Sequence, residues 1–269
     1  MIDLHSHILP GLDDGAQTMD EALEMARIAE RDGIKKIVAT PHLFRNNFIH
    51  KDLGIIEKKR EELSQALKKN NIHVEVFAGA EVHISHSLID EIKKNRNSLV
   101  INQSSYMFVE FSSEHVFSGV KNLFFELMSE GITPIIAHPE RNSVFIRNPS
   151  LLYELVEMEA LCQANSGSFS GLYGSRTQEA VYHFLELGLF HFIASDCHNT
   201  RSITPRLSEA LAKATAIVGA KKANALVREN PKAVLDNDQE LPYFPQPLNP
   251  REKEKSFNIK IPNIFRRKK

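Results

Sequence analysis

The sequence predicts an α/β protein whose parallel strands form a sheet or a closed barrel, and three observations support this class. Short apolar and β-branched runs alternate with helical patterns along most of the chain, which is the signature of βα repeats. The length of 269 residues suits one α/β barrel as well as two small domains. The content of 42% hydrophobic and 25% charged residues is typical of a globular protein and excludes an intrinsically disordered chain.

About seven strands are expected, and all of them are short and apolar. They cover residues 1–7, 36–40, 74–80, 106–109, 133–137, 161–165 and 191–195. The first helix is marked by Thr18 and Glu21, which form a capping-box pattern, and by Gly33, which is a good helix stop. Later helices are expected at residues 57–69, 88–94, 120–129, 149–159, 177–187, 206–218 and 221–228.

The composition also bounds the compartment and the partners. With 33 Lys+Arg against 34 Asp+Glu the formal net charge is −1, so no basic excess is present to neutralise the phosphates of a nucleic acid. Two cysteines cannot build a disulfide framework, and no run approaches the roughly 18 apolar residues of a transmembrane helix. The N-terminus has no signal-peptide pattern. We therefore expect a cytoplasmic protein that does not bind nucleic acid.

Residues 1–240 are expected to form the compact domain, and residues 241–269 a flexible tail. Prolines break the segment at residues 242, 245, 247 and 250, and the chain ends in two arginines and two lysines at residues 266–269. This basic end is consistent with a solvated tail. It is equally consistent with weak contact to an anionic membrane surface or an acidic partner.

Residues that commonly bind metals end six of the seven expected strands. Because the carboxyl ends of parallel strands lie on one side of a βα fold, we expect these side chains to converge. One further acid lies in the first βα loop. The predicted metal ligands are His5, His7, Asp14, His42, Glu81, Glu110, His138, Asp196 and His198.

This mixed set of imidazoles and carboxylates favours a cluster of divalent cations. Four carboxylates in one pocket would repel one another, whereas bound cations remove that penalty. His5 and His7 lie on one face of their strand because side chains alternate with a period of two. Nine ligands exceed what one ion takes, so two or three ions are expected, and the N/O set accepts Mn, Fe, Co or Zn.

Other interpretations of the same residues stay open at this point. A lone buried histidine is more often a packed core residue, and Glu81 and Glu110 alternatively cap helices or lie on the rim. Cys197 has no Cys-x5-Arg phosphate loop around it and is expected to be a buried structural thiol. The remaining histidines are assigned to packing or to solvent: His50, His73, His83, His86, His115, His183 and His191.

A pocket with several metals predicts hydrolysis, and a phosphoryl substrate also needs a cationic clamp. Arg141 is the leading candidate because it follows a ligand strand directly, in the sequence His-Pro-Glu-Arg. Arg201 and Arg206 follow His198 closely enough to reach the same rim. Each of the three arginines is alternatively an exposed surface residue.

Taken in order, these motifs resemble those of the polymerase and histidinol phosphatase (PHP) superfamily. Within it, the chain is similar to the bacterial manganese-dependent protein-tyrosine phosphatases of capsule and exopolysaccharide operons. The resemblance covers about residues 1–235. It rests on the segments MIDLHSHILP (1–10), LDDG (12–15), ATPH (39–42), GAE (79–81), VEF (109–111), IAHPER (136–141) and ASDCHN (194–199).

The resemblance implies a distorted (β/α)7 barrel with three metal ions, most commonly Mn²⁺. The ligand sets that it implies are His5, His7, Glu81 and Asp196 for one ion, Glu81, Glu110 and His138 for a second, and Asp14, His42 and His198 for a third. It also implies a phosphate-binding arginine at Arg141. The second arginine of similar proteins corresponds to Ile203 here, so Arg201 or Arg206 would have to substitute.

The leading hypothesis is hydrolysis of phosphotyrosine on a cognate membrane-associated tyrosine kinase that regulates capsule or exopolysaccharide synthesis. A metal-activated hydroxide attacks phosphorus, Arg141 neutralises the phosphoryl oxygens, and His42 or His198 positions a proton-donating water. One alternative is a small-molecule phosphatase such as histidinol phosphatase. A PHP nuclease is disfavoured by the neutral charge. The other alternative is a non-catalytic module that docks on the kinase or on the membrane.

Overall fold

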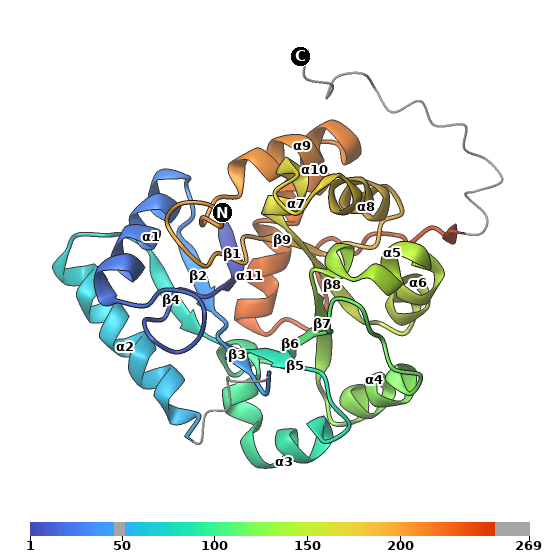
Figure 1. Cartoon of the computed structure of the whole chain (residues 1–269), viewed down its shortest axis with the longest axis horizontal. Helices are drawn as coiled ribbons and strands as arrows, with labels where there is room; N and C mark the ends of the chain where they lie inside the picture. The colour runs from blue at the N-terminus through green and yellow to red at the C-terminus, as the bar shows by residue number, and fades with distance from the viewer. Residues whose placement is uncertain (46–51, 251–269) are drawn as a thin grey trace.

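The structure is a computed structural model that describes residues 1–45 and 52–250. The strands lie at the centre of the molecule and the helices surround them (Figure 1). One sheet has the order β1-β2-β4, with bounds Ile2–Ser6, Lys36–Ala39 and Glu75–Ala78. The other has the order β3-β5-β6-β7-β8-β9, with bounds His42–Leu43, Glu81–His83, Tyr106–Glu110, Thr133–Ala137, Leu161–Asn165 and Phe192–Ala194. All neighbouring strands are parallel.

Two of the seven expected strands are each divided in two. Residues 36–40 form β2, and the chain resumes as β3 after Pro41, whose nitrogen cannot donate to a ladder. Residues 74–80 form β4, and β5 begins shortly after Gly79, where a Cβ would lie 2.9 Å from Val38 Cγ1. The strand order survives both breaks because β2 pairs with β4 and β3 pairs with β5.

The two sheets meet between β1 and the end of β9. An isolated parallel bridge joins Ser6 and Cys197. Beside it, His7 N donates to Cys197 O and Asp196 N donates to His5 O, each at 2.9 Å. The prediction of an α/β protein with parallel strands is therefore confirmed. The strands form two linked sheets rather than one continuous hydrogen-bonded barrel.

Alternate residues of the strands pack into two different cores. Leu4, Phe108 and Phe192 belong to a small buried cluster, whereas Met107 and Ile193 belong to the larger cluster shared with the helices. This division follows from the two-residue period of a strand. The buried polar residues include the side chains of the predicted metal site, and others such as Asp3 and His191 lie at the amino-terminal ends of strands.

The helices connect the strands in the expected alternation. Their bounds are Met19–Arg31 (α1), Gly54–Lys69 (α2), Leu88–Leu99 (α3), Val120–Ser129 (α4), Ser143–Arg147 (α5), Pro149–Glu157 (α6), Ser166–Ser170 (α7), Ser175–Glu186 (α8), Ser208–Val218 (α9), Ala220–Ala225 (α10) and Glu229–Asp236 (α11), with 3₁₀ turns at Ile101–Gln103 (η1) and Pro139–Arg141 (η2). The predicted helix start is confirmed, since Thr18 is the N-cap and its Oγ1 accepts from Glu21 N at 3.2 Å. The capping box is incomplete, because Glu21 Oε2 accepts from Gln17 N at 3.0 Å rather than from the N–H of Thr18. None of the helices in the described ranges is long and apolar enough to cross a membrane.

The first part of the proline-rich segment contacts the compact domain. Tyr243 N donates to Asn230 Oδ1 at 2.9 Å, and Leu248 N donates to Leu187 O at 2.8 Å. Residues 251–269, which carry the basic end of the chain, lie outside the described residues. The flexible tail expected there stays a prediction.

Candidate metal centre

Eight of the nine predicted ligands form three overlapping groups, and His42 and Glu81 among them begin β3 and β5 rather than end a strand. In each group, one nitrogen or carboxylate oxygen per residue lies within 4.8 Å of the others. The groups are His5, His7, Glu81 and Asp196; His7, Asp14, His42 and His198; and His42, Glu81 and Glu110. The ninth residue, His138, places Nε2 3.0 Å from Glu81 Oε1.

The first group is fully buried. His5 Nε2 lies 3.4 Å from both Glu81 Oε2 and Asp196 Oδ1, and His7 Nε2 lies 3.2 Å from Asp196 Oδ1. Glu81 Oε2 and Asp196 Oδ1 nevertheless have no hydrogen-bond partner. Two buried carboxylate oxygens that converge on imidazole nitrogens without hydrogen bonding to them are suited to a shared cation.

The second and third groups extend the site from the first. His42 contacts both of them, because Nδ1 lies 2.8 Å from Glu81 Oε2 and Nε2 lies 3.4 Å from Asp14 Oδ1. His198 Nε2 lies 3.3 Å from the same Asp14 oxygen. Glu110 Oε2 lies 3.7 Å from His42 Nδ1. The side chain of Asp14 is half exposed, so the site opens to solvent on this side.

The imidazoles and carboxylates of the site shift one another's pKa values. Burial lowers the pKa of His5, but Glu81 and Asp196 outweigh that effect and raise the pKa to about 8. Burial raises the pKa of Glu81 and of Asp196, and the nearby histidines nevertheless hold both pKa values well below their usual range. The acids are therefore ionised at neutral pH, as metal ligands must be.

Unusual backbone conformations position two of the predicted ligands. His138 has φ 33° and Asp196 has φ 51°, which lie in the left-handed region that non-glycine residues rarely adopt. The loop that carries Asp14 is also tightly fixed, because a Cβ on Gly15 would lie 2.0 Å from His7 O. Only glycine fits at that close approach.

Three polar residues that the sequence did not reveal hold the ligands in place. Gln163 Oε1 lies 2.9 Å from His5 Nδ1, and Asp13 Oδ2 lies 2.6 Å from His7 Nδ1. Asn165 Nδ2 donates to Asp196 Oδ2 at 2.7 Å. The available signal was a buried polar residue at a strand end, in the segment Leu-Cys-Gln-Ala-Asn. Such outer partners fix the ring orientation of metal-binding histidines.

Arg141 lies at the edge of this site, as expected. Its Nη1 donates to Asp196 Oδ2 at 2.7 Å, and its guanidinium carbon lies 4.3 Å from the ring centroid of Tyr173. Arg141 lines a pocket of about 440 Å³ together with Glu110, His138 and Arg45. A cationic donor and predicted metal ligands thus face one cavity.

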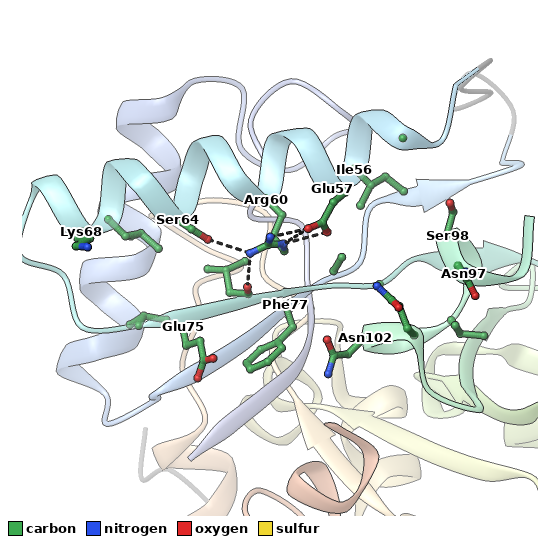
Figure 2. A pocket seen from close by; sticks show the side chains of 18 of the residues that line it. Ile56, Glu57, Arg60, Ser64, Lys68, Glu75, Phe77, Asn97, Ser98 and Asn102 are labelled. Carbon is green, nitrogen blue, oxygen red and sulfur yellow. Dashed lines mark hydrogen bonds and ion pairs between the residues drawn. The ribbon is translucent and has the colours of Figure 1, made fainter. Parts of the chain in front are cut away.

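The other two candidate arginines lie elsewhere. Arg201 and Arg206 line a separate pocket of about 550 Å³, bounded by the end of α1 and the start of α9, and none of the predicted metal ligands lines it. The structure therefore does not bring either residue into the cavity that Arg141 lines. A larger pocket of about 890 Å³ lies between α2 and β4 (Figure 2), and it too is lined by none of the predicted ligands.

Two expectations about bystander residues have different outcomes. Cys197 is buried, and burial raises the pKa of its thiol, so it lacks the thiolate character of a nucleophile. His83, assigned to packing or solvent, instead lies in the pocket of Arg141, with Nδ1 3.4 Å from Glu110 Oε2. His50 lies outside the described residues.

Sequence comparison finds relatives that match nearly the whole chain. The chain is 38% identical over 260 residues to the tyrosine-protein phosphatase YwqE of Bacillus subtilis. This match covers 96% of this chain and 100% of the relative. It is 29% identical over 242 residues to the tyrosine-protein phosphatase CpsB of Streptococcus agalactiae, covering 88% and 99% of the two chains.

The structural comparison gives the same result. A chain from the crystal structures of YwqE from Bacillus subtilis and CpsB from Streptococcus pneumoniae, described as unique metal-dependent tyrosine phosphatases, matches with a TM-score of 0.86 and 37% identity. The match covers 92% of this chain and 99% of that one. The model of the capsular polysaccharide synthesis family CpsB/CapC matches residues 1–236. The chain therefore belongs to the CpsB/CapC family of capsular polysaccharide synthesis proteins.

Proposed function

We propose that this protein is a metal-dependent protein-tyrosine phosphatase that acts in capsular or exopolysaccharide synthesis. The observation that carries the proposal is the set of three overlapping ligand groups next to a cavity lined by Arg141. The tyrosine-phosphatase names of the relatives supply the substrate class. Two or three divalent ions are proposed, with Mn²⁺ as the native metal.

The ligand residues divide the work between binding ions and orienting the substrate. When bound, the ions would supply ionisation of water near neutral pH and neutralisation of charge on the phosphoryl group. Glu81, His7 and His42 each belong to two ligand groups, so each of them would lie close to more than one ion. Arg141 provides a guanidinium fork for the phosphoryl oxygens and is oriented by Asp196 and Tyr173.

The leaving group of phosphotyrosine is a phenolate, whose low basicity lessens the need for a strong general acid. His198 and His42 lie on the solvent-facing side of the site through their shared contact with Asp14. They are proposed to position a water that donates the proton to the phenolate.

Several finer features belong to the same proposal. The bridge between Ser6 and Cys197 links the first and last strands, which supports a distorted (β/α)7 barrel in solution. The substrate is proposed to be a phosphotyrosine-bearing kinase at the membrane, and the protein is proposed to act in the cytoplasm. The basic end at residues 266–269 supplies charge for weak contact with that membrane surface.

The test combines metal removal with a choice of substrates. Chelation is expected to abolish hydrolysis of a phosphotyrosyl peptide, and Mn²⁺ to restore it. Glu81→Gln should reduce both bound metal and turnover, turnover by about a hundredfold or more, because Glu81 belongs to two ligand groups. Glu126→Gln, a change of an exposed acid on α4, is the matched control.

Two results would contradict the proposal. Faster hydrolysis of histidinol phosphate than of the phosphotyrosyl peptide would favour a small-molecule phosphatase. Loss of activity in Cys197→Ser, with activity retained after chelation, would show cysteine chemistry instead. Deletion of residues 251–269 addresses the docking alternative, since unchanged peptide turnover with lost kinase binding would assign the tail to docking.

A further inference from the structure

We propose that Arg45 is the second arginine that binds the phosphoryl group of the substrate, opposite Arg141. This inference rests on the proposed phosphatase function. Arg45 lies two residues beyond β3, the strand that begins with His42. Its Nη1 lies 3.1 Å from Glu110 Oε1 and donates to His42 Nε2 at 2.9 Å.

Arg45 and Arg141 line the same cavity and approach the ligand groups from different strands. Arg45 contacts Glu110 at the end of β6, whereas Arg141 contacts Asp196 just beyond β9. Both guanidinium groups are accessible, since the side chain of Arg45 is 39% exposed and that of Arg141 is 34% exposed. A phosphoryl group held in this cavity would meet a forked donor on each side.

The contact between Arg45 and His42 supports a role toward substrate rather than a fixed structural one. His42 Nε2 is also the atom that faces Asp14 in a predicted ligand group. A nitrogen that binds an ion has no lone pair left for a hydrogen bond. Arg45 therefore loses this acceptor when the site is loaded, and its N–H groups become available to an anion in the cavity.

Arg201 and Arg206, the residues that the sequence offered for this role, line the separate pocket beside α9. Arg201 N and Ser202 N donate to Asn199 Oδ1 at 2.9 and 2.8 Å, which folds this loop as a tight turn directly after His198. In the part of the chain that the structure describes, Arg45 and Arg141 are the arginines with a hydrogen bond or ion pair to a predicted metal ligand.

The experiment measures binding of inorganic phosphate to the metal-loaded protein by calorimetry, so that it does not depend on turnover. Arg45→Gln should raise the phosphate Kd about ten- to one hundred-fold, as expected for loss of hydrogen bonds between charged groups. Arg45→Lys should restore part of the affinity because it keeps the charge without the fork. Arg27→Gln on α1 is the matched control, with the same 39% exposure and an ion pair to Glu24. It should leave the Kd unchanged.

Metal content and kinetics separate this role from other roles. Bound metal per chain should be the same in wild type, Arg45→Gln and Arg45→Lys, and the KM for a phosphotyrosyl peptide should rise with the phosphate Kd. Loss of metal in Arg45→Gln with an unchanged phosphate Kd after reloading would overturn the proposal and make Arg45 a ligand-positioning residue. Weaker phosphate binding in Arg201→Gln or Arg206→Gln, but not in Arg45→Gln, would overturn it as well.

Phosphate binding and peptide hydrolysis by wild type test the role of Arg45 and the proposed phosphatase function separately. If wild type binds phosphate through Arg45 but hydrolyses no phosphotyrosyl peptide, the phosphatase assignment fails while the anion site stands. If wild type hydrolyses the peptide and Arg45→Gln binds phosphate as tightly as wild type does, the phosphatase assignment stands and the role of Arg45 is refuted.

Discussion

Asp13 connects three parts of the site although it belongs to none of the ligand groups. Its Oδ2 lies 2.6 Å from His7 Nδ1 and accepts from His42 N at 3.0 Å, while Oδ1 accepts from Gly15 N at 2.9 Å. A proton held on His7 Nδ1 by this carboxylate leaves Nε2 free to bind an ion. One buried acid thereby fixes the tautomer of His7. It also holds the backbone of His42 and the loop that carries Asp14 in place.

Replacing this acid should weaken metal binding without removing a ligand. Asp13→Asn is expected to reduce metal affinity about ten- to one hundred-fold, the usual cost of losing an outer partner of a ligating histidine. Titration of the chelated protein with Mn²⁺ measures the change, with Asp20→Asn on the exposed face of α1 as control. An affinity equal to that of wild type would refute this role for Asp13.

The residues that gather at the candidate site were predictable from the sequence, but the residues that support them were not. His5 and His7 could be recognised because an HxH pair at a strand end has a short sequence signature. Gln163 and Asn165 show only that they are polar residues in an apolar strand, since an amide becomes a support only when another strand brings a predicted ligand within hydrogen-bond distance. The position of Arg45 was likewise invisible, because the turn after β3 decides which cavity its side chain enters.

At the scale of elements, α1 and α9 are joined by one side chain. The carboxylate of Asp32, at the C-terminal end of α1, accepts from Leu207 N at 2.7 Å and from Ser208 N at 3.0 Å. It therefore caps a helix that begins 176 residues later in the chain. Capping by a side chain from another element satisfies amide donors that a helix N-terminus leaves open.

Loss of this cap should destabilise the fold but spare the metal centre. Asp32→Ala is expected to lower the free energy of unfolding by about 1–2 kcal/mol. Glu126→Ala should stay within about 0.5 kcal/mol of wild type, because the acid is exposed on α4. Urea unfolding measures both. Equal midpoints for the two variants would show that the contact contributes nothing.

The elements themselves were largely predictable from periodicity, and the exceptions have local causes. The break between β2 and β3 falls at Pro41, whose nitrogen cannot donate to a ladder, and the break after β4 falls at Gly79, which lies close to Val38. The short helix α5 starts where the Asn142 side chain accepts from Val144 N and Phe145 N. Such five-residue helices are too short to show an amphipathic period.

At the scale of the whole molecule, a buried histidine links stability to pH. His191 lies just before β9, and its Nδ1 accepts from Cys162 N at 3.1 Å. Its Nε2 is buried without a hydrogen-bond partner, and burial lowers the pKa of His191 to about 3. Asn230 and the ring of Phe244 cover it from the end of the chain.

The sign of the effect follows from proton counting. The unfolded chain binds a proton at His191 below about pH 6.5, whereas the folded protein does not until about pH 3. The contribution of neutral His191 to the free energy of unfolding is therefore fully present above pH 6.5. It falls as the pH is lowered from 6.5 towards 3, by up to about 1.4 kcal/mol per pH unit.

The His191→Asn variant isolates this effect, because the amide oxygen can replace Nδ1 as acceptor without titrating. As the pH is lowered from 6.5 to 4, the free energy of unfolding should fall more for wild type than for the variant. His73→Asn, at an exposed position, should follow the wild type. Parallel curves for wild type and His191→Asn would mean that His191 is protonated in the folded state.

The order of the ligands along the chain also bears on biosynthesis. His5 is translated long before Asp196 and His198, which lie far along the chain. Each of the other two groups, besides that of His42, Glu81 and Glu110, includes a residue that follows the last strand, β9. A nascent or truncated chain therefore cannot assemble the full centre. Loading of the proposed ions into the complete centre would therefore require that the segment after β9 has been synthesised.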